Sequence, residues 1–86
     1  MDVIEVRTKI KEIISNITSI PVDQIEDGAS FRDDLDLDSL SLLEIGVDVD
    51  YAFKLGVPEE RLQQLATVQD TVDLVLSHKA AQAVGA

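Results

Sequence analysis

The stretch DDLDLDSLSLLE, from Asp33 to Glu44, decides how the rest of the chain is interpreted. Its first half alternates aspartate with leucine, and its second half spaces leucines as a helix does. A helix is therefore expected to begin near Ser39, directly after the densest negative charge in the sequence. Three explanations compete for this serine: it borders a metal-binding loop, it is a catalytic nucleophile, or another enzyme modifies it.

The alternating aspartates match the opening of a calcium-binding EF-hand loop. Asp34, Asp36 and Asp38 would be its first three side-chain ligands, but the sixth and twelfth positions then require glycine and glutamate. Ser39 and Ile45 stand there instead. The chain also contains no cysteine, which removes the usual kind of zinc site. We therefore expect no metal site.

A catalytic role for Ser39 also lacks its partners. Such a serine needs a base to accept its proton and donors for an oxyanion, and it often lies in a Gly-x-Ser-x-Gly turn. His78 is the only histidine and belongs to the last predicted helix, while Asp38 and Leu40 flank the serine. We expect no catalytic residues and a protein that is not an enzyme. Ser39 is then either an ordinary helix cap or a hydroxyl that another enzyme modifies.

Composition and charge bound the class of protein. Eighty-six residues predict a single domain, 1–86, and 45% hydrophobic residues with only 3% aromatic ones predict an aliphatic core. The net charge is −10, and ten acids but only one base lie between Asp23 and Asp50. This charge disfavours nucleic acid and anionic lipid and suits partners with basic surfaces. The N-terminal stretch MDVIEVRTKI is not a signal peptide, and we expect a cytoplasmic monomer without a membrane span.

The apolar spacing predicts an all-α fold, a small four-helix bundle with three main helices and one short helix. Asp2 is expected to cap the first helix, whose apolar stripe is Val3, Val6, Ile10, Ile13, Ile14 and Ile17. A long loop, SIPVDQIEDGASFRDDLDLD, separates it from the second helix, and its apolar residues indicate that it packs on the core with a short helical turn after Pro21. We expect residues 3–78 to fold and residues 80–86 to form a loose tail.

The later helices are bounded by recognisable signals. The second helix is expected to run from about Ser39 to Phe53 and to end before Gly56. The short third helix begins at Pro58, with the sequence PEERLQQL. Thr67 with Asp70 is typical of a capping box and opens the last helix, which turns Val68, Val72, Val75 and Leu76 inward.

The second helix carries two apolar faces. At about 100° per residue, Leu42, Ile45, Val49 and Phe53 form one stripe, which should face the core. Leu40, Leu43, Val47 and Tyr51 form another on the opposite side, flanked by Glu44 and Asp50. Apolar side chains bordered by acids suit a transient partner, so we expect Leu40, Glu44, Val47 and Asp50 to form a docking surface. Gly46, inside this helix, admits the close approach of another segment.

Two longer stretches resemble the acyl carrier protein family. ASFRDDLDLDSLSLLEI, residues 29–45, resembles its signature, in which Phe and Leu lead into Asp-Ser-Leu at the start of the second helix. GVPEERLQQLATVQDTVDLV, residues 56–75, resembles the remainder, and the likeness extends from about Val3 to Val75. The resemblance implies that Ser39, between Asp38 and Leu40, receives 4′-phosphopantetheine from coenzyme A through a phosphopantetheinyl transferase. The arm would then carry acyl groups as thioesters to basic surfaces of fatty-acid or polyketide enzymes.

The resemblance has departures, and alternatives stay open. Many members have glycine where this chain has Asp36, and they have acids in the middle of the second helix where this chain has Gly46 and Tyr51. Peptidyl carriers usually show Gly-Gly-(His or Asp)-Ser-Leu, unlike LDLDSL, while a D-alanyl carrier remains compatible. A helical interaction module without a cofactor, which binds a basic partner through its acidic helix, is the alternative from another class.

Overall fold

The computed structural model describes residues 3–84, with side chains through Lys79. Its helices are α1 (Val3–Thr18), α2 (Ser39–Phe53), α3 (Glu59–Leu62) and α4 (Val68–Val84), and a 3₁₀ turn, η1, spans Val22–Gln24. The predicted arrangement of three main helices and one short helix is therefore confirmed. The predicted cap Asp2 lies outside the described residues.

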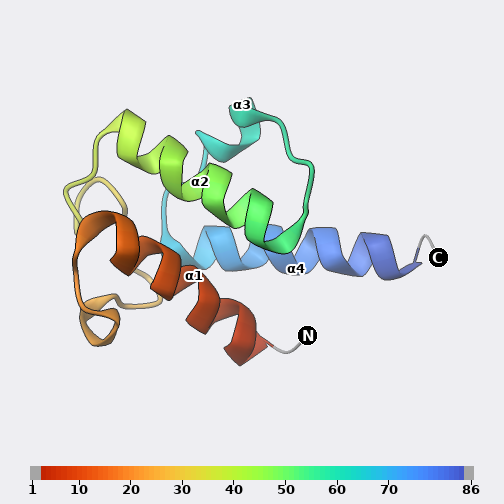
Figure 1. Ribbon diagram of the computed structural model, residues 1–86, viewed down its shortest axis with the longest axis horizontal. Coiled ribbons are helices and arrows are strands. Elements are labelled where there is room, and N and C mark those ends of the chain that lie inside the picture. The colour runs from red at the N-terminus through yellow and green to blue at the C-terminus, as the bar shows by residue number, and fades with distance from the viewer. Residues whose placement is uncertain (1–2, 85–86) are drawn as a thin grey trace.

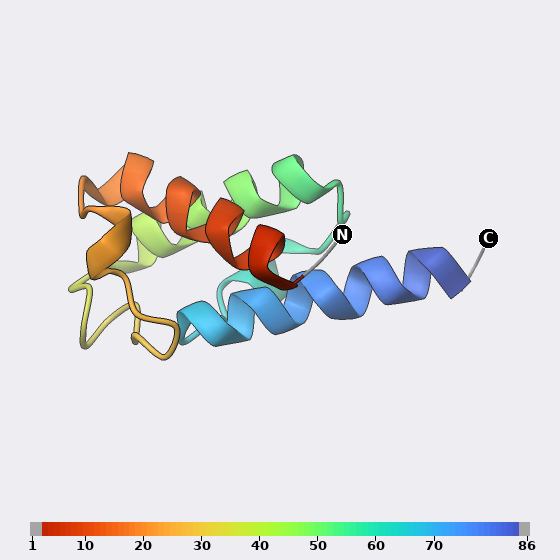
Figure 2. The same cartoon turned by 90° about the horizontal axis from the view of Figure 1, so that it is seen from below.

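The helices are arranged in two layers. Figure 2 shows α1 and α2 side by side above α4, and Figure 1 shows α3 beside α2. The C-terminal part of α4 projects beyond the other helices in both views. None of the helices within residues 3–84 is long and apolar enough to cross a membrane.

The core lies between the layers and is almost entirely aliphatic, as the composition predicts. The inward stripe of α2 is buried at every predicted position, and α1 and α4 bury most of theirs in the same core. Val3 is 43% exposed because it stands in the first turn, at the free end of α1, and Ile17 of α1 and Leu76 of α4 are only partly buried. The buried apolar side chains of the three main helices are Val6, Ile10, Ile13, Ile14, Leu42, Ile45, Val49, Phe53, Val68, Val72, Leu74 and Val75. Each contributes roughly 1.5–3 kcal/mol when fully removed from water.

The long connection between α1 and α2 packs on the core, as its apolar residues predict. Ile25, Ala29 and Phe31 are buried, and the predicted turn after Pro21 is η1. Two backbone hydrogen bonds attach the connection to the start of α4: Phe31 N donates to Ala66 O at 2.9 Å, and Val68 N donates to Ala29 O at 3.0 Å. This attachment fixes the path of the chain towards Ser39.

The predictions for the two ends of α4 have different outcomes. At its start, Asp70 N donates to Thr67 Oγ1 at 3.1 Å and Thr67 N donates to Asp70 Oδ2 at 3.2 Å, so the capping box is confirmed. At its end, the helix continues through residues 80–84, where we expected a loose tail. Alanine and glutamine are good helix formers, and residues 80–84 contain no proline or glycine, which accounts for the extension. Residues 85–86 of that predicted tail lie outside the described part.

Another segment packs closely against Gly46, as expected, and the structure identifies it. The segment that approaches it is α3: a Cβ added to Gly46 would lie 2.8 Å from the Cβ of Leu62. Leu62 is itself 2% exposed, so α2 and α3 meet here almost at backbone level. The helical part of α3 is shorter than PEERLQQL suggested, ending at Leu62, although Leu65 beyond it is also buried.

Candidate functional site

Ser39 occupies the first turn of α2, with its side chain exposed. The residue that caps this helix is Asp38, whose Oδ1 accepts a hydrogen bond from Ser41 N at 2.8 Å. That bond, with a further one from the Ser41 side chain, lowers the pKa of the Asp38 carboxyl. Within residues 3–84, the structure shows no hydrogen bond to the Ser39 hydroxyl. Ser39 is therefore not needed as a cap, and its oxygen is accessible.

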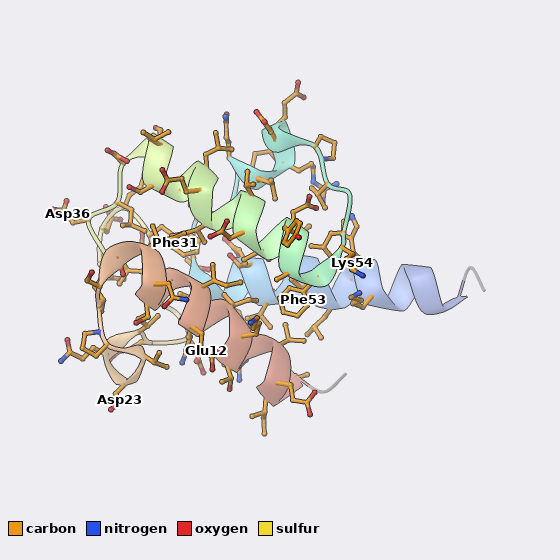
Figure 3. The ribbon with its side chains drawn as sticks, viewed as in Figure 1. Glu12, Asp23, Phe31, Asp36, Phe53 and Lys54 are labelled. Carbon is orange, nitrogen blue, oxygen red and sulfur yellow. The ribbon has the colours of Figure 1, made fainter. Side chains whose placement is uncertain are left out.

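Hydrogen bonds between near neighbours shape the loop that leads to this serine. Asp34 Oδ2 accepts from Ser30 N at 2.7 Å, and Ser30 Oγ accepts from Asp33 N at 3.2 Å. Leu37 N then donates to Phe31 O at 2.9 Å, which closes the loop on a buried aromatic ring. Figure 3 shows Phe31 inside the bundle, opposite the outward-pointing side chain of Asp36. The loop is thus attached to the core through Phe31 and leaves Ser39 exposed at the start of α2.

The chemistry available around Ser39 is limited. His78 lies towards the end of α4, where its Nδ1 is 3.2 Å from the Leu74 carbonyl oxygen, and the described residues show no hydrogen bond between its ring and Ser39. Among the described side chains, no group of three or more His, Cys, Asp and Glu residues is arranged to hold a metal ion. Two of the three alternating aspartates, Asp34 and Asp38, instead bond to backbone amides.

The predicted docking residues divide into two kinds. Leu40 and Val47 are 66% and 43% exposed, and Glu44 is exposed between them on the same side of α2. Asp50 is half-buried, and its Oδ1 accepts a hydrogen bond from Val57 N at 2.9 Å. Asp50 therefore also holds the turn from α2 to α3, a structural role that the sequence did not reveal.

Comparison with known proteins gives this arrangement its context. The family model described as the phosphopantetheine attachment site matches residues 8–75. The acyl carrier protein of Rubrobacter xylanophilus is 36% identical over 81 residues, which cover 94% of this chain and all of that protein. The chain belongs to the acyl carrier protein family. The carrier of Buchnera aphidicola is 40% identical over 70 residues, covering 81% of this chain and 89% of its own.

A solved carrier structure supports the same fold. The acyl carrier protein from Enterococcus faecalis, a structure described in terms of its high thermal stability, superimposes with a TM-score of 0.73 at 33% identity. The match covers 91% of this chain and 99% of the other. The all-helical carrier fold and the presence of a phosphopantetheine attachment site are thus shown for this chain.

One departure of this carrier from the family pattern has a structural consequence. Asp36, which stands where many members have glycine, has a φ of 54°. That left-handed conformation is costly for most residues with a Cβ, although aspartate tolerates it better than most. The loop therefore has the same bend that a glycine would favour, with an added negative charge at its tip.

Proposed function

We propose that this protein carries acyl groups as thioesters on 4′-phosphopantetheine attached to the Oγ of Ser39. The observation that carries the proposal is the exposed Ser39 hydroxyl at the start of α2. This hydroxyl is not used as a helix cap, because Asp38 caps the helix. Asp38 and Leu40 flank the attachment point, and the family match implies the cofactor. The missing thiol of this cysteine-free chain is then supplied by the arm.

A phosphopantetheinyl transferase performs the attachment. The Ser39 oxygen attacks the β-phosphorus of coenzyme A, a phosphodiester forms, and 3′,5′-ADP leaves with the electrons of the broken pyrophosphate bond. The proton of the hydroxyl passes to a base of the transferase, because His78 lies elsewhere in the fold. The new phosphodiester anion stands in the first turn of α2, where the helix dipole favours negative charge.

The carrier's partners are basic surfaces of enzymes that process acyl groups. The proposed docking surface consists of Leu40, Glu44 and Val47, with Asp50 adding charge from the flank while it holds the α2–α3 turn. Charge accelerates the encounter and the apolar contacts fix its register. We place this activity in the cytoplasm and assign it to a monomer, since a net charge of −10 opposes self-association.

Intact-mass measurement tests the attachment. The apo-protein, incubated with coenzyme A and a broad-specificity transferase, should gain the mass of one phosphopantetheine. Ser39→Ala should gain nothing, while Ser41→Ala, which keeps the backbone amide that Asp38 binds, should be loaded like the wild type. Loading of the alanine variant at position 39 would disprove the assignment.

Intact-mass measurements of the loaded protein and of protein purified from its source separate the alternatives. A cofactor-free interaction module would stay unmodified in both forms. An amino-acid carrier would be loaded with the arm but would carry an aminoacyl group when purified from its source, whereas we expect a fatty-acid or polyketide thioester.

A further inference from the structure

The outward side of α2 contains a residue that the sequence-derived docking surface left out. Tyr51 is 85% exposed, the highest value among the exposed large hydrophobic side chains of the described residues. It lies at the far end of the helix from Ser39, in the last turn. At that exposure the ring makes little contact with the described part of the fold.

Tyr51 belongs to the same stripe as the docking residues. Leu40, Glu44, Val47 and Tyr51 are spaced by four, three and four residues, which places all four within about 60° of one another around the helix. We call these four residues the outer stripe. Asp50 lies to one side of it, and its carboxylate oxygen is already bonded to Val57 N. The outer stripe therefore ends in an aromatic ring and not in an acid.

The length of the outer stripe fits one enzyme footprint. Tyr51 stands eleven positions after Leu40, so the stripe is about 16 Å long at 1.5 Å per residue. A standard interface buries about 800 Å² on each partner, which corresponds to a disc of about 16 Å radius. A partner centred on the middle of the stripe has both ends about 8 Å from its centre. A footprint centred on the stripe therefore includes both Leu40, which is next to Ser39, and Tyr51.

We propose that Tyr51 is a docking residue that inserts into an apolar recess of the enzyme acting on Ser39, whose basic residues face Glu44 and the acidic loop. This inference rests on the proposed function. Tyrosine suits such a contact because its ring offers apolar area while its hydroxyl stays in water. A second copy of this chain is disfavoured as the occupant, since Glu44 and Asp48 would face like charges at such an interface.

Steady-state kinetics of loading test the assignment, with a broad-specificity phosphopantetheinyl transferase and coenzyme A as the probe. Tyr51→Ala should raise the KM for the apo-carrier about tenfold and leave kcat unchanged, as expected when the removed aromatic side chain contributes to binding alone. Tyr51→Phe should restore the wild-type KM, because it keeps the ring. Ile4→Ala, which removes another exposed apolar side chain from a different helix, should behave as the wild type.

Further variants and measurements give the opposing outcomes. Tyr51→Glu should be no better than Tyr51→Ala, and a KM at or below the wild-type value would mean that the partner presents a cation there, against the proposal. A wild-type KM for Tyr51→Ala would overturn it directly. Sedimentation would also overturn it if the wild-type protein were a dimer and Tyr51→Ala a monomer, because Tyr51 would then contact a second copy of this chain. The thermal midpoints of all Tyr51 variants should match the wild type. Absence of loading in the wild-type protein would instead refute the Ser39 assignment.

Discussion

Gly46→Ala is the substitution that most directly tests the packing of α2 against α3. The added Cβ would lie 2.8 Å from Leu62 Cβ and 3.4 Å from Leu62 Cγ, while carbon atoms in good contact stand about 3.5–4.0 Å apart. The closest atom is a Cβ, so rotation of the leucine side chain cannot relieve the contact and α3 must move. Overpacking of this kind costs about 1–3 kcal/mol, and alanine regains about 1 kcal/mol of helix propensity. We expect a net loss of about 0–2 kcal/mol.

Chemical denaturation followed by circular dichroism measures that loss. The matched control is Gly28→Ala, because a Cβ at Gly28 meets nothing within 4 Å and the variant should be neutral or slightly stabilising. The loss of stability caused by Gly46→Ala should disappear when it is measured in a Leu62→Gly background. In a Leu62→Ala background it should only become smaller, because the alanine Cβ remains. A Gly46→Ala protein more stable than the wild type by the full helix-propensity gain would refute the close approach of the two helices.

Four further variants test local features. Asp38→Ala should lower the thermal midpoint at neutral pH, because the hydrogen bond from Ser41 N lowers the pKa of Asp38 in the folded protein. The stability that this bond contributes is complete above the unfolded pKa of about 3.9 and is lost as the pH falls through the folded pKa. The melting curves of the wild type and the variant should therefore converge in acid. Lys54→Gly should stabilise the protein by about 0.5–1 kcal/mol in urea denaturation, since Lys54 has a φ of 54°, whereas Gly56→Ala, at a φ of 72°, should destabilise it by about 1 kcal/mol. Lys11→Met should cost less than about 1 kcal/mol, because the 2.6 Å contact of Lys11 Nζ with Asp27 Oδ1 ends on an exposed carboxylate, and the difference should vanish in about 1 M salt.

The parts of the fold that the sequence predicted depend on neighbours within one or two helical turns. The inward stripe of α2 follows from its 3.6-residue period, and the capping box follows from Thr67 and Asp70 standing three residues apart. The contact of Gly46 with Leu62 joins segments separated by a turn of irregular conformation. The sequence indicates that something approaches the glycine, but not which segment does so.

The candidate site shows the same division. Ser39 could be selected from charge, helix position and family resemblance, all of which are local or statistical properties of the sequence. That Asp38 and not Ser39 caps the helix could not be decided, because both residue types serve equally well as caps. The structure decides this point: the Asp38 carboxylate lies 2.8 Å from Ser41 N, so Asp38 caps the helix and the Ser39 hydroxyl does not.

The docking residues show why a helix surface cannot be assigned from periodicity alone. Helical angles place both Asp50 and Tyr51 within about 80° of Leu40 and Val47, and the charge of the chain favours the acid as the docking residue. The structure shows that Asp50 bonds to Val57 N across the turn, whereas Tyr51 is 85% exposed. The hydrogen bond satisfies one carboxylate oxygen inside the protein, so less of that charge is available to a partner. The outer stripe therefore presents acid near the serine and an aromatic ring far from it, and a partner must match this order to dock in register.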